Sequence, residues 1–221
     1  MMKWSFSGLK DFINCPRQYK EVKIDKRYVK EVTSQMNYGT VVHKALEDYA
    51  RDGTPLPEFY KRYQPLMDAL LGLSNPEERF LEHKMALTQS KEPCAFDAPD
   101  YWVRGIADFM CVVGGTCFIV DYKTGSNKYA DTKQLKLMAL MTFAHMPEVD
   151  LVKAGLLFVA HNTFPTEDYR REDIDSLWDV FKYDLLRLEQ ANATGHWPEN
   201  PTGLCGWCPV STCVHHRQRK K

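Results

Sequence analysis

An aspartate and a lysine two residues apart are the first feature of this sequence that could do chemistry. Asp121 and Lys123 follow a short apolar run that is typical of a buried strand, and residues two apart in a strand share a face. A second carboxylate, Asp108, lies in the preceding apolar segment. Because Gly114 and Gly115 between the two segments suit a tight hairpin turn, we expect the three side chains to lie together.

Two carboxylates and an ammonium group suit a hard divalent cation and a phosphodiester. An acid two residues before a lysine occurs four times in the chain, so that spacing has no weight outside this context. Buried charges cost free energy unless they bind something. Mg²⁺ is held by one or two carboxylates and water, and a nearby lysine can orient an attacking water. The cluster predicts phosphodiester hydrolysis; the alternative is a pair of surface aspartates with Lys123 as their ion-pair partner.

The spacing of apolar residues predicts the elements that position this cluster. A first short helix ends at Cys15, because Pro16 follows it. Further helices are predicted at 38–50, 57–71, 133–143 and 174–188, and strands at 101–113, 117–120 and 154–160, while 80–87 fits either type. The helix at 38–50 carries His43.

Composition limits the class of protein. The chain has 221 residues, 29 basic and 29 acidic side chains and no net charge, so nucleic-acid binding would have to come from local patches. No apolar run approaches the 18 or so residues of a membrane span, and we expect no membrane partner and a cytoplasmic location, in a prokaryotic cell or a phage-infected host. Seven cysteines in a reducing compartment are not expected to form disulfides.

Five segments resemble, in order, the PD-(D/E)XK nucleases, and among them the RecB-like exonucleases with an iron–sulfur cluster, which include CRISPR adaptation nucleases and related phage proteins. These segments are Ser5–Leu9, Cys15–Tyr19, Gly39–Glu47, Gly105–Asp108 and Asp121–Gly125. The resemblance implies an α/β fold in which helices flank a mixed central sheet and an iron–sulfur cluster joins the two termini. It implies one nuclease domain, 1–221, with a core at 36–195 and a cluster-binding part made of 1–35 and 196–221.

The resemblance also implies the site residues. His43, Asp108, Asp121 and the main-chain carbonyl of Tyr122 are the expected metal ligands, and Lys123 is the expected catalytic lysine. These nucleases usually carry a glutamine and, one helical turn later, a tyrosine after the lysine.

Only half of that last motif is present here. Gln134 matches the glutamine and is expected to hold a catalytic water or a phosphate, but Met138 replaces the tyrosine. Two alternatives remain for the role of that tyrosine: Tyr129 takes it, or no aromatic ring takes it in this protein. For Glu82 there are two interpretations, a catalytic acid and an exposed strand residue, and the second is favoured.

Three cysteines near the C-terminus form a metal-binding pattern. Cys205, Cys208 and Cys213 have the spacing C-x₂-C-x₄-C. His215 or His216 would complete a Cys₃His zinc site. The resemblance points instead to Cys15 as the fourth ligand of a [4Fe-4S] cluster.

The sequence therefore predicts a DNA exonuclease that uses Mg²⁺ or Mn²⁺ in recombination, repair or CRISPR adaptation. Single-stranded DNA or a free DNA end fits best as substrate, with Arg17, Tyr19 and Lys20 as contacts that combine cations with a ring for base stacking. A second copy or a recombination or CRISPR protein is a conceivable partner. The alternatives are a catalytically weak DNA-end-binding protein, a zinc-stabilised adaptor and an electron carrier.

Overall fold

The computed structural model describes residues 2–127, 131–159, 161 and 163–216. The chain separates into two compact units. One unit is Thr33–Val180, and the other combines Met1–Val32 with Phe181–Lys221. The expected division into a core and a cluster-binding part stays a prediction. None of the helices in the described part of the chain is long and apolar enough to cross a membrane.

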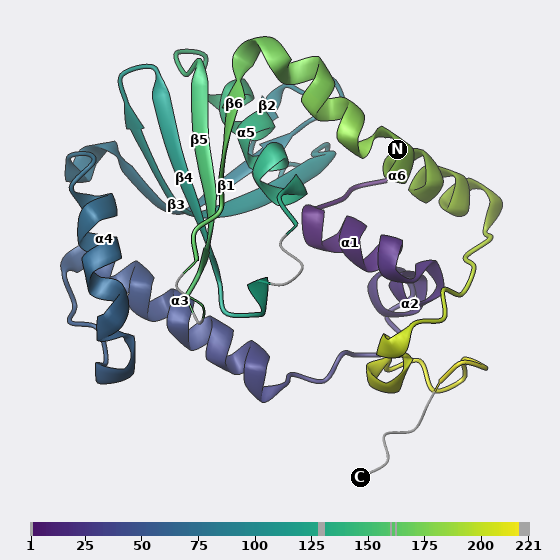
Figure 1. Cartoon of the computed structure of the whole chain (residues 1–221). Coiled ribbons are helices and arrows are strands. Elements are labelled where there is room, and N and C mark those ends of the chain that lie inside the picture. The colour runs from purple at the N-terminus through teal and green to yellow at the C-terminus, as the bar shows by residue number, and fades with distance from the viewer. Residues whose placement is uncertain (1, 128–130, 160, 162, 217–221) are drawn as a thin grey trace. The chain divides into compact units, whose positions relative to one another are not determined.

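The unit 33–180 is built on a six-stranded sheet (Figure 1) with the order β2-β1-β3-β4-β5-β6. Neighbouring strands run antiparallel except β4 and β5, which are parallel. This mixed sheet confirms the expected α/β fold. The strands are β1 (Arg79–Leu87), β2 (Pro93–Cys94), β3 (Val103–Val113), β4 (Thr116–Lys123), β5 (Leu151–Phe158) and β6 (Thr166–Arg170).

Helix α5 (Lys133–His145) covers one face of this sheet and provides the crossover that parallel β4 and β5 require. Residues Leu135 and Leu137–Phe143 are all buried, as expected for a helix packed on a sheet. A Cβ atom at Gly105 would collide with the side chain of Met138 and would lie 3.3 Å from Met141 Sδ. A glycine in β3 therefore lets α5 approach the strand closely.

Helices α3 (Ser34–Asp52) and α4 (Gln64–Leu71) cover the other face. Their apolar side chains, including Val42, Leu46 and Met67, join one core with Phe109 and Tyr122 of the sheet.

Three elements differ from the sequence expectation. The helix expected at 57–71 is a 3₁₀-helix, Glu58–Tyr63, followed by α4; Pro65 has no N–H to donate, so it cannot continue a preceding helix. The ambiguous segment at 80–87 is strand β1. Edge strand β6 was not expected, because its sequence, TEDYR, is mainly polar.

The other unit brings the two ends of the chain together. Helix α1 (Phe6–Asn14) begins at Ser5, whose Oγ accepts a hydrogen bond from the N–H of Gly8, and ends before Pro16 as expected. Helix α2 (Pro16–Tyr19) and a π-helical turn (Lys20–Ile24) follow. The unit is completed by the part of helix α6 (Ile174–Thr194) that begins at residue 181 and by the 3₁₀-helix Gly203–Trp207.

Hydrogen bonds hold the chain ends side by side in this unit, and two of them lie on either side of Cys15. The N–H of Arg17 donates to the carbonyl of Pro198 at 3.2 Å. The Asn200 side chain donates to the carbonyl of Asn14 at 2.9 Å. Cys15 therefore lies in a segment that is bonded to the cysteine-containing tail.

Candidate metal centre

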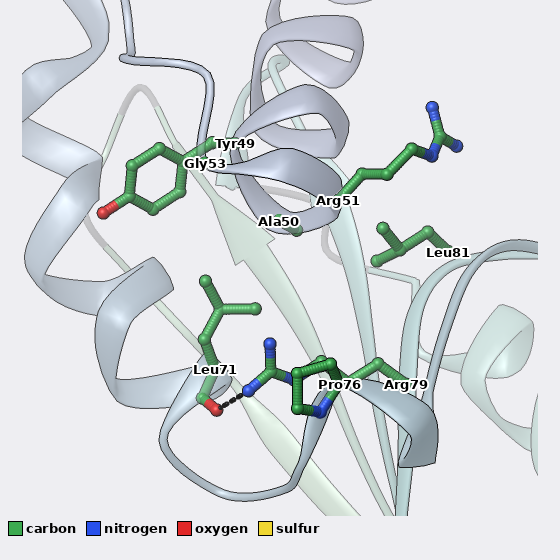
Figure 2. Close-up of a pocket in the computed structure, with 8 residues that line it drawn as sticks. All are labelled: Tyr49, Ala50, Arg51, Gly53, Leu71, Pro76, Arg79 and Leu81. Atoms are coloured by element: carbon green, nitrogen blue, oxygen red, sulfur yellow. Dashed lines mark hydrogen bonds between the residues drawn. The ribbon is translucent and has the colours of Figure 1, made fainter.

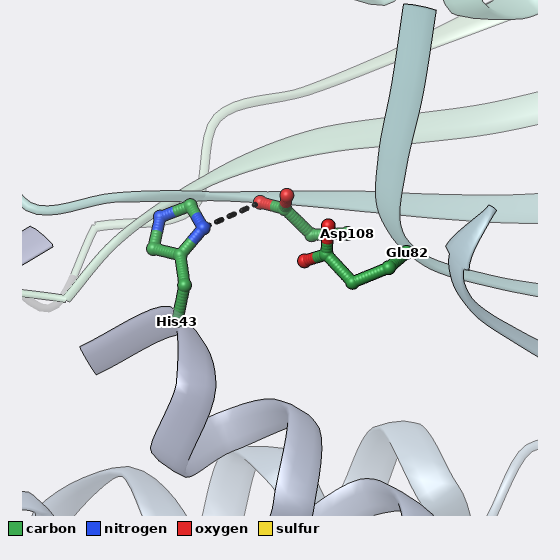
Figure 3. Close-up of side chains that lie close together, drawn as sticks. All are labelled: His43, Glu82 and Asp108. Carbon is green, nitrogen blue, oxygen red and sulfur yellow. Dashed lines mark ion pairs between the residues drawn. The ribbon is translucent and has the colours of Figure 1, made fainter. Parts of the chain in front are cut away.

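Three side chains from three different elements converge at one point of the unit 33–180 (Figure 3). His43 of α3, Glu82 of β1 and Asp108 of β3 each offer a ligand atom, and these atoms lie within 4.8 Å of one another. A Cβ atom at Gly39 would lie 3.0 Å from Thr124 Oγ1, so a glycine allows α3 to pack close to the end of β4. This close packing brings His43 to the sheet. An imidazole with two carboxylates is a donor set that suits a divalent cation.

The Asp108 carboxylate contacts two other expected ligand residues, Tyr122 and His43. Its Oδ2 accepts a hydrogen bond from the N–H of Tyr122 at 2.6 Å and lies 3.5 Å from His43 Nδ1. The Tyr122 ring meets the His43 ring edge-on, with 5.7 Å between their centroids. The expected ligands His43, Asp108 and Tyr122 are therefore neighbours.

Glu82 has an unusual backbone conformation. Its φ angle is 49°, a left-handed value that costs a non-glycine residue on the order of 1 kcal/mol or more. It lies between the strand pairs Leu81–Phe109 and His83–Ala107, and therefore opposite Asp108. The side chain is half-buried and points at the cluster, so the interpretation of Glu82 as an exposed strand residue is wrong.

Asp121, Lys123 and Gln134 form a second group beside Asp108. Lys123 Nζ lies 2.6 Å from Asp121 Oδ2 and donates to Gln134 Oε1 at 2.8 Å. The Gln134 amide in turn donates to Asp121 Oδ1. Gln134 at the start of α5 thus joins the aspartate and the lysine in one network, and its expected role in holding a water or a phosphate stays a prediction.

The position of the missing tyrosine lies in the core. Met138 is 2% exposed and contacts the position where a Cβ of Gly105 would be. It does not extend the Gln134 network. Tyr129 lies outside the described residues.

The electrostatics of the centre favour a cation. Burial and the charge of Asp108 raise the pKa of Asp121 to about 6, although Lys123 opposes this shift. Burial, followed by the charge of Asp108, also raises the pKa of Glu82. Burial lowers the pKa of His43, but its hydrogen bond to Asp108 and the surrounding carboxylates outweigh burial, and the net shift is upward. Burial first, and the neighbouring carboxylates second, therefore make the charged forms of Asp121 and Glu82 costly without a cation.

We expect Asp121→Asn to stabilise the metal-free protein at neutral pH. The pKa of Asp121 rises from 3.8 to about 6 on folding, so the folded state binds the proton more tightly, and stability falls as pH rises from about 4 to above 6. At pH 7 the removed cost is on the order of 2 to 3 kcal/mol. Thermal melting in a chelator at pH 4 to 8 measures it.

The control for that measurement is Asp168→Asn, since Asp168 is an exposed strand aspartate that also pairs with a lysine, Lys153. It should leave the pH dependence unchanged. A lower melting temperature for Asp121→Asn at pH 7 would show that the charged carboxylate is a net stabiliser.

A cavity of about 510 Å³ lies between the end of α3, the end of α4 and the start of β1 (Figure 2). Arg79 in its wall donates to the carbonyls of Leu71 and Ser74, and Arg51 is paired with Glu47. Neither His43 nor a carboxylate lines this cavity. It is separate from the metal cluster.

The four expected cluster ligands all lie in the other unit. Cys15 Sγ accepts a hydrogen bond from the N–H of Gln18 at 3.5 Å, and Cys205 Sγ accepts one from the N–H of Thr202 at 3.4 Å. Within the described ranges, no three Cys or His ligand atoms of this unit lie within 4.8 Å of one another. His216 Nδ1 is buried without a hydrogen-bond partner.

The expected DNA contacts are engaged within the same unit. Tyr19 is 7% exposed and stacks on Trp197. Arg17 is paired with Glu199, and Lys20 Nζ lies 2.6 Å from Asp25 Oδ2. Contact of these residues with DNA stays a prediction.

Comparisons with known proteins give a family for the chain and solved structures to which it is similar. The family model described as "PD-(D/E)XK nuclease superfamily" matches residues 3–213. Among solved structures, a "Putative exonuclease" from Eubacterium rectale is 14% identical with a TM-score of 0.52, over 99% of this chain and 90% of that one. The structure of SSO0001 is 13% identical with a TM-score of 0.49, over 97% and 87%. No curated protein matches the chain.

The family match covers nearly all of the chain, from the first helix through the last cysteine. It includes Asp108, Asp121 and Lys123, which sequence spacing and the hairpin predict to lie together and which meet beside the C-terminal end of β4. On this basis the chain belongs to the PD-(D/E)XK nuclease superfamily.

Proposed function

We propose that this protein is a metal-dependent DNA exonuclease that prefers single-stranded DNA. The observation that carries the proposal is the network of Asp121, Lys123 and Gln134 beside the cluster of His43, Glu82 and Asp108. The cluster of His43, Glu82 and Asp108 offers ligands for a cation. The network around Lys123 offers an ammonium group that can contact a phosphate or a water. Both are what phosphodiester hydrolysis needs.

The residues fit Mg²⁺ or Mn²⁺. His43, Asp108, Asp121 and the Tyr122 carbonyl would hold the ion, with Glu82 as a further carboxylate. When bound, the ion would polarise a phosphate oxygen and lower the pKa of a bound water. The raised pKa of Asp121 means that this carboxylate carries its charge at low cost only when a cation is present.

Lys123 is the proposed catalytic residue. Its side chain is 33% exposed, while its ammonium group contacts Asp121. Gln134 limits its freedom by accepting one of its N–H donors. A lysine fixed in this way can orient a water or neutralise charge that develops on a phosphate.

We also propose a [4Fe-4S] cluster on Cys15, Cys205, Cys208 and Cys213. The fit rests on the four thiols of one unit and on the main-chain N–H groups that already donate to two of the sulfurs, a type of contact that tunes such clusters. In a closed zinc site the Zn–S distance is about 2.3 Å, so two sulfurs lie at most about 4.6 Å apart, whereas no three Cys or His ligand atoms in the described part of this unit lie within 4.8 Å of one another. The buried, unpartnered Nδ1 of His216 supports the zinc alternative.

The wider setting is part of the proposal. Arg17, Tyr19 and Lys20 would contact the DNA after some rearrangement of their present pairs. Recombination, repair or CRISPR adaptation in the cytoplasm would supply the DNA ends, with a second copy or another protein of that process as a partner.

The test is a nuclease assay on end-labelled linear single strands, linear duplexes and circular single strands, with Mg²⁺, Mn²⁺ or a chelator. We expect metal-dependent loss of the linear single strand and an intact circle. Cleavage of the circle would make the protein an endonuclease. Tight binding to ends without any hydrolysis would favour the DNA-end-binding alternative.

A further inference from the structure

A group of cations and rings lies along the same strands as the metal cluster. We name it the Arg104 surface, and it consists of Lys84 of β1, Phe96 and Tyr101 of the loop regions beside β2 and β3, and Arg104 of β3. The Arg104 guanidinium lies 4.7 Å from the centroids of both rings. Lys84 Nζ lies 5.4 Å from the Phe96 centroid. All four residues belong to the unit that carries the metal cluster.

Strand alternation places this surface and the metal cluster on one face of the sheet. Between Arg104 and Asp108 the side chains alternate, so Arg104, Ile106 and Asp108 share a face. The position of Gly105 faces α5, whereas Asp108 meets His43 of α3 on the opposite side. Lys84 pairs directly with Ile106 across the strands, which puts it on that face too.

The path between the two places is open. Ile106 is 37% exposed and Lys84 is exposed. Four residues of a strand span about 14 Å from Asp108 to Arg104. That length corresponds to about four nucleotides at a stacked rise of 3.4 Å, so a strand that ends at the metal cluster could reach Arg104.

The Arg104 surface is prepared for an anion. Its guanidinium is held by two rings, by Asp97 Oδ1 at 2.8 Å and by the carbonyl of Phe96 at 3.4 Å, and both of those hydrogen bonds use Nη1. A guanidinium has five N–H donors, so Nε and Nη2 are the atoms through which it would contact a phosphate. Because the group is already fixed, little conformational entropy is lost on binding.

We propose that the Arg104 surface binds the single-stranded DNA that extends from the metal cluster. Lys84 and Arg104 contact its phosphates, and Ile106, Phe96 and Tyr101 contact its sugars and bases. This inference rests on the proposed function, since it takes the metal cluster to be the place of cleavage. Positive charge next to aromatic rings matches the chemistry of a single strand better than that of an acidic polypeptide, which has no bases to stack.

The test measures the binding of labelled single strands of about 4 to about 16 nucleotides by fluorescence anisotropy in a Lys123→Ala background. Lys84→Gln with Arg104→Gln should weaken binding of the longer strands roughly tenfold and reduce the salt slope by about 1.4, the value for two phosphate contacts. The loss should shrink for strands too short to reach Arg104. Lys153→Gln is the matched control, because Lys153 is a strand lysine paired with an aspartate elsewhere in the sheet.

Four outcomes decide between the explanations. Equal affinity of the double variant and the control would overturn the inference, and so would equally strong competition by polyglutamate. If Arg104→Gln lowers the melting temperature, the exposed Lys84→Gln alone still has to reduce the salt slope. If the double variant loses binding but the wild-type protein never hydrolyses DNA, the Arg104 surface is supported and the proposed nuclease activity is refuted.

Discussion

Replacing Lys123 by alanine is expected to lower the rate of DNA hydrolysis by a factor of about 10² to 10³ or more, the typical effect of removing one preorganised electrostatic group from a polar transition state. The change removes the ammonium but leaves the ligands for the cation in place. It also frees Gln134 and Asp121 from their contacts with Nζ. Metal binding should therefore persist while turnover is lost.

Single-turnover kinetics with end-labelled single strands measure this loss, and titration calorimetry with Mn²⁺ measures the metal affinity. Asp108→Ala and Asp121→Ala should abolish hydrolysis as well, but with weaker metal binding, because they remove ligands. Lys153→Ala should have ordinary activity. Full activity of Lys123→Ala, in a preparation cleared of contaminating nucleases, would refute the assignment of the catalytic lysine.

The second large effect is expected for Cys15→Ser. Cys15 and Cys205 are 190 residues apart in the sequence, and the loop-entropy expression for a disulfide, used by analogy, gives about 5 kcal/mol for such a link. That is comparable to the net stability of a typical domain, about 5 to 15 kcal/mol. The variant should lose the visible absorption of the cluster, melt at a much lower temperature and expose both chain ends to protease.

Cys94→Ser is the matched control, because Cys94 is also partly exposed but lies in the other unit. It should keep the absorption and the melting temperature. His216→Ala separates the two metals: it should be nearly silent with a cluster on four cysteines and damaging with a Cys₃His zinc site. Zinc without iron after anaerobic purification would refute the cluster, and unaltered stability of Cys15→Ser would refute the cross-link.

The fold was largely predictable because its main signals are local. Apolar periodicity indicates α3 and α5, Pro16 marks the end of α1, and the two glycines at 114 and 115 indicate the β3–β4 hairpin. These features depend on neighbours a few residues away. The same hairpin brings Asp108 near Asp121, so the proximity of these two carboxylates could be predicted from the sequence, while their roles stay a prediction.

Features that depend on long-range register were not predictable. Glu82 joins the cluster only because β1 pairs with β3 in one particular register. The connection between the two strands, residues 88–102, is too long to fix that register in the way that a tight turn does. Its left-handed backbone gives no signal in sequence, since the residue is not glycine. The polar edge strand β6 was missed for a related reason: its pairing with β5, rather than its own side chains, makes it a strand.

The close packing of Gly105 against Met138 also limits how this nuclease could change during evolution. A tyrosine at 138, the residue common among the nucleases that the sequence resembles, would need space that β3 and α5 leave only for a slender, flexible thioether. A side chain at 105 would in turn displace Met138. The two positions are therefore coupled, and a tyrosine at 138 would require helix α5 and strand β3 to move apart before the ring could be accommodated.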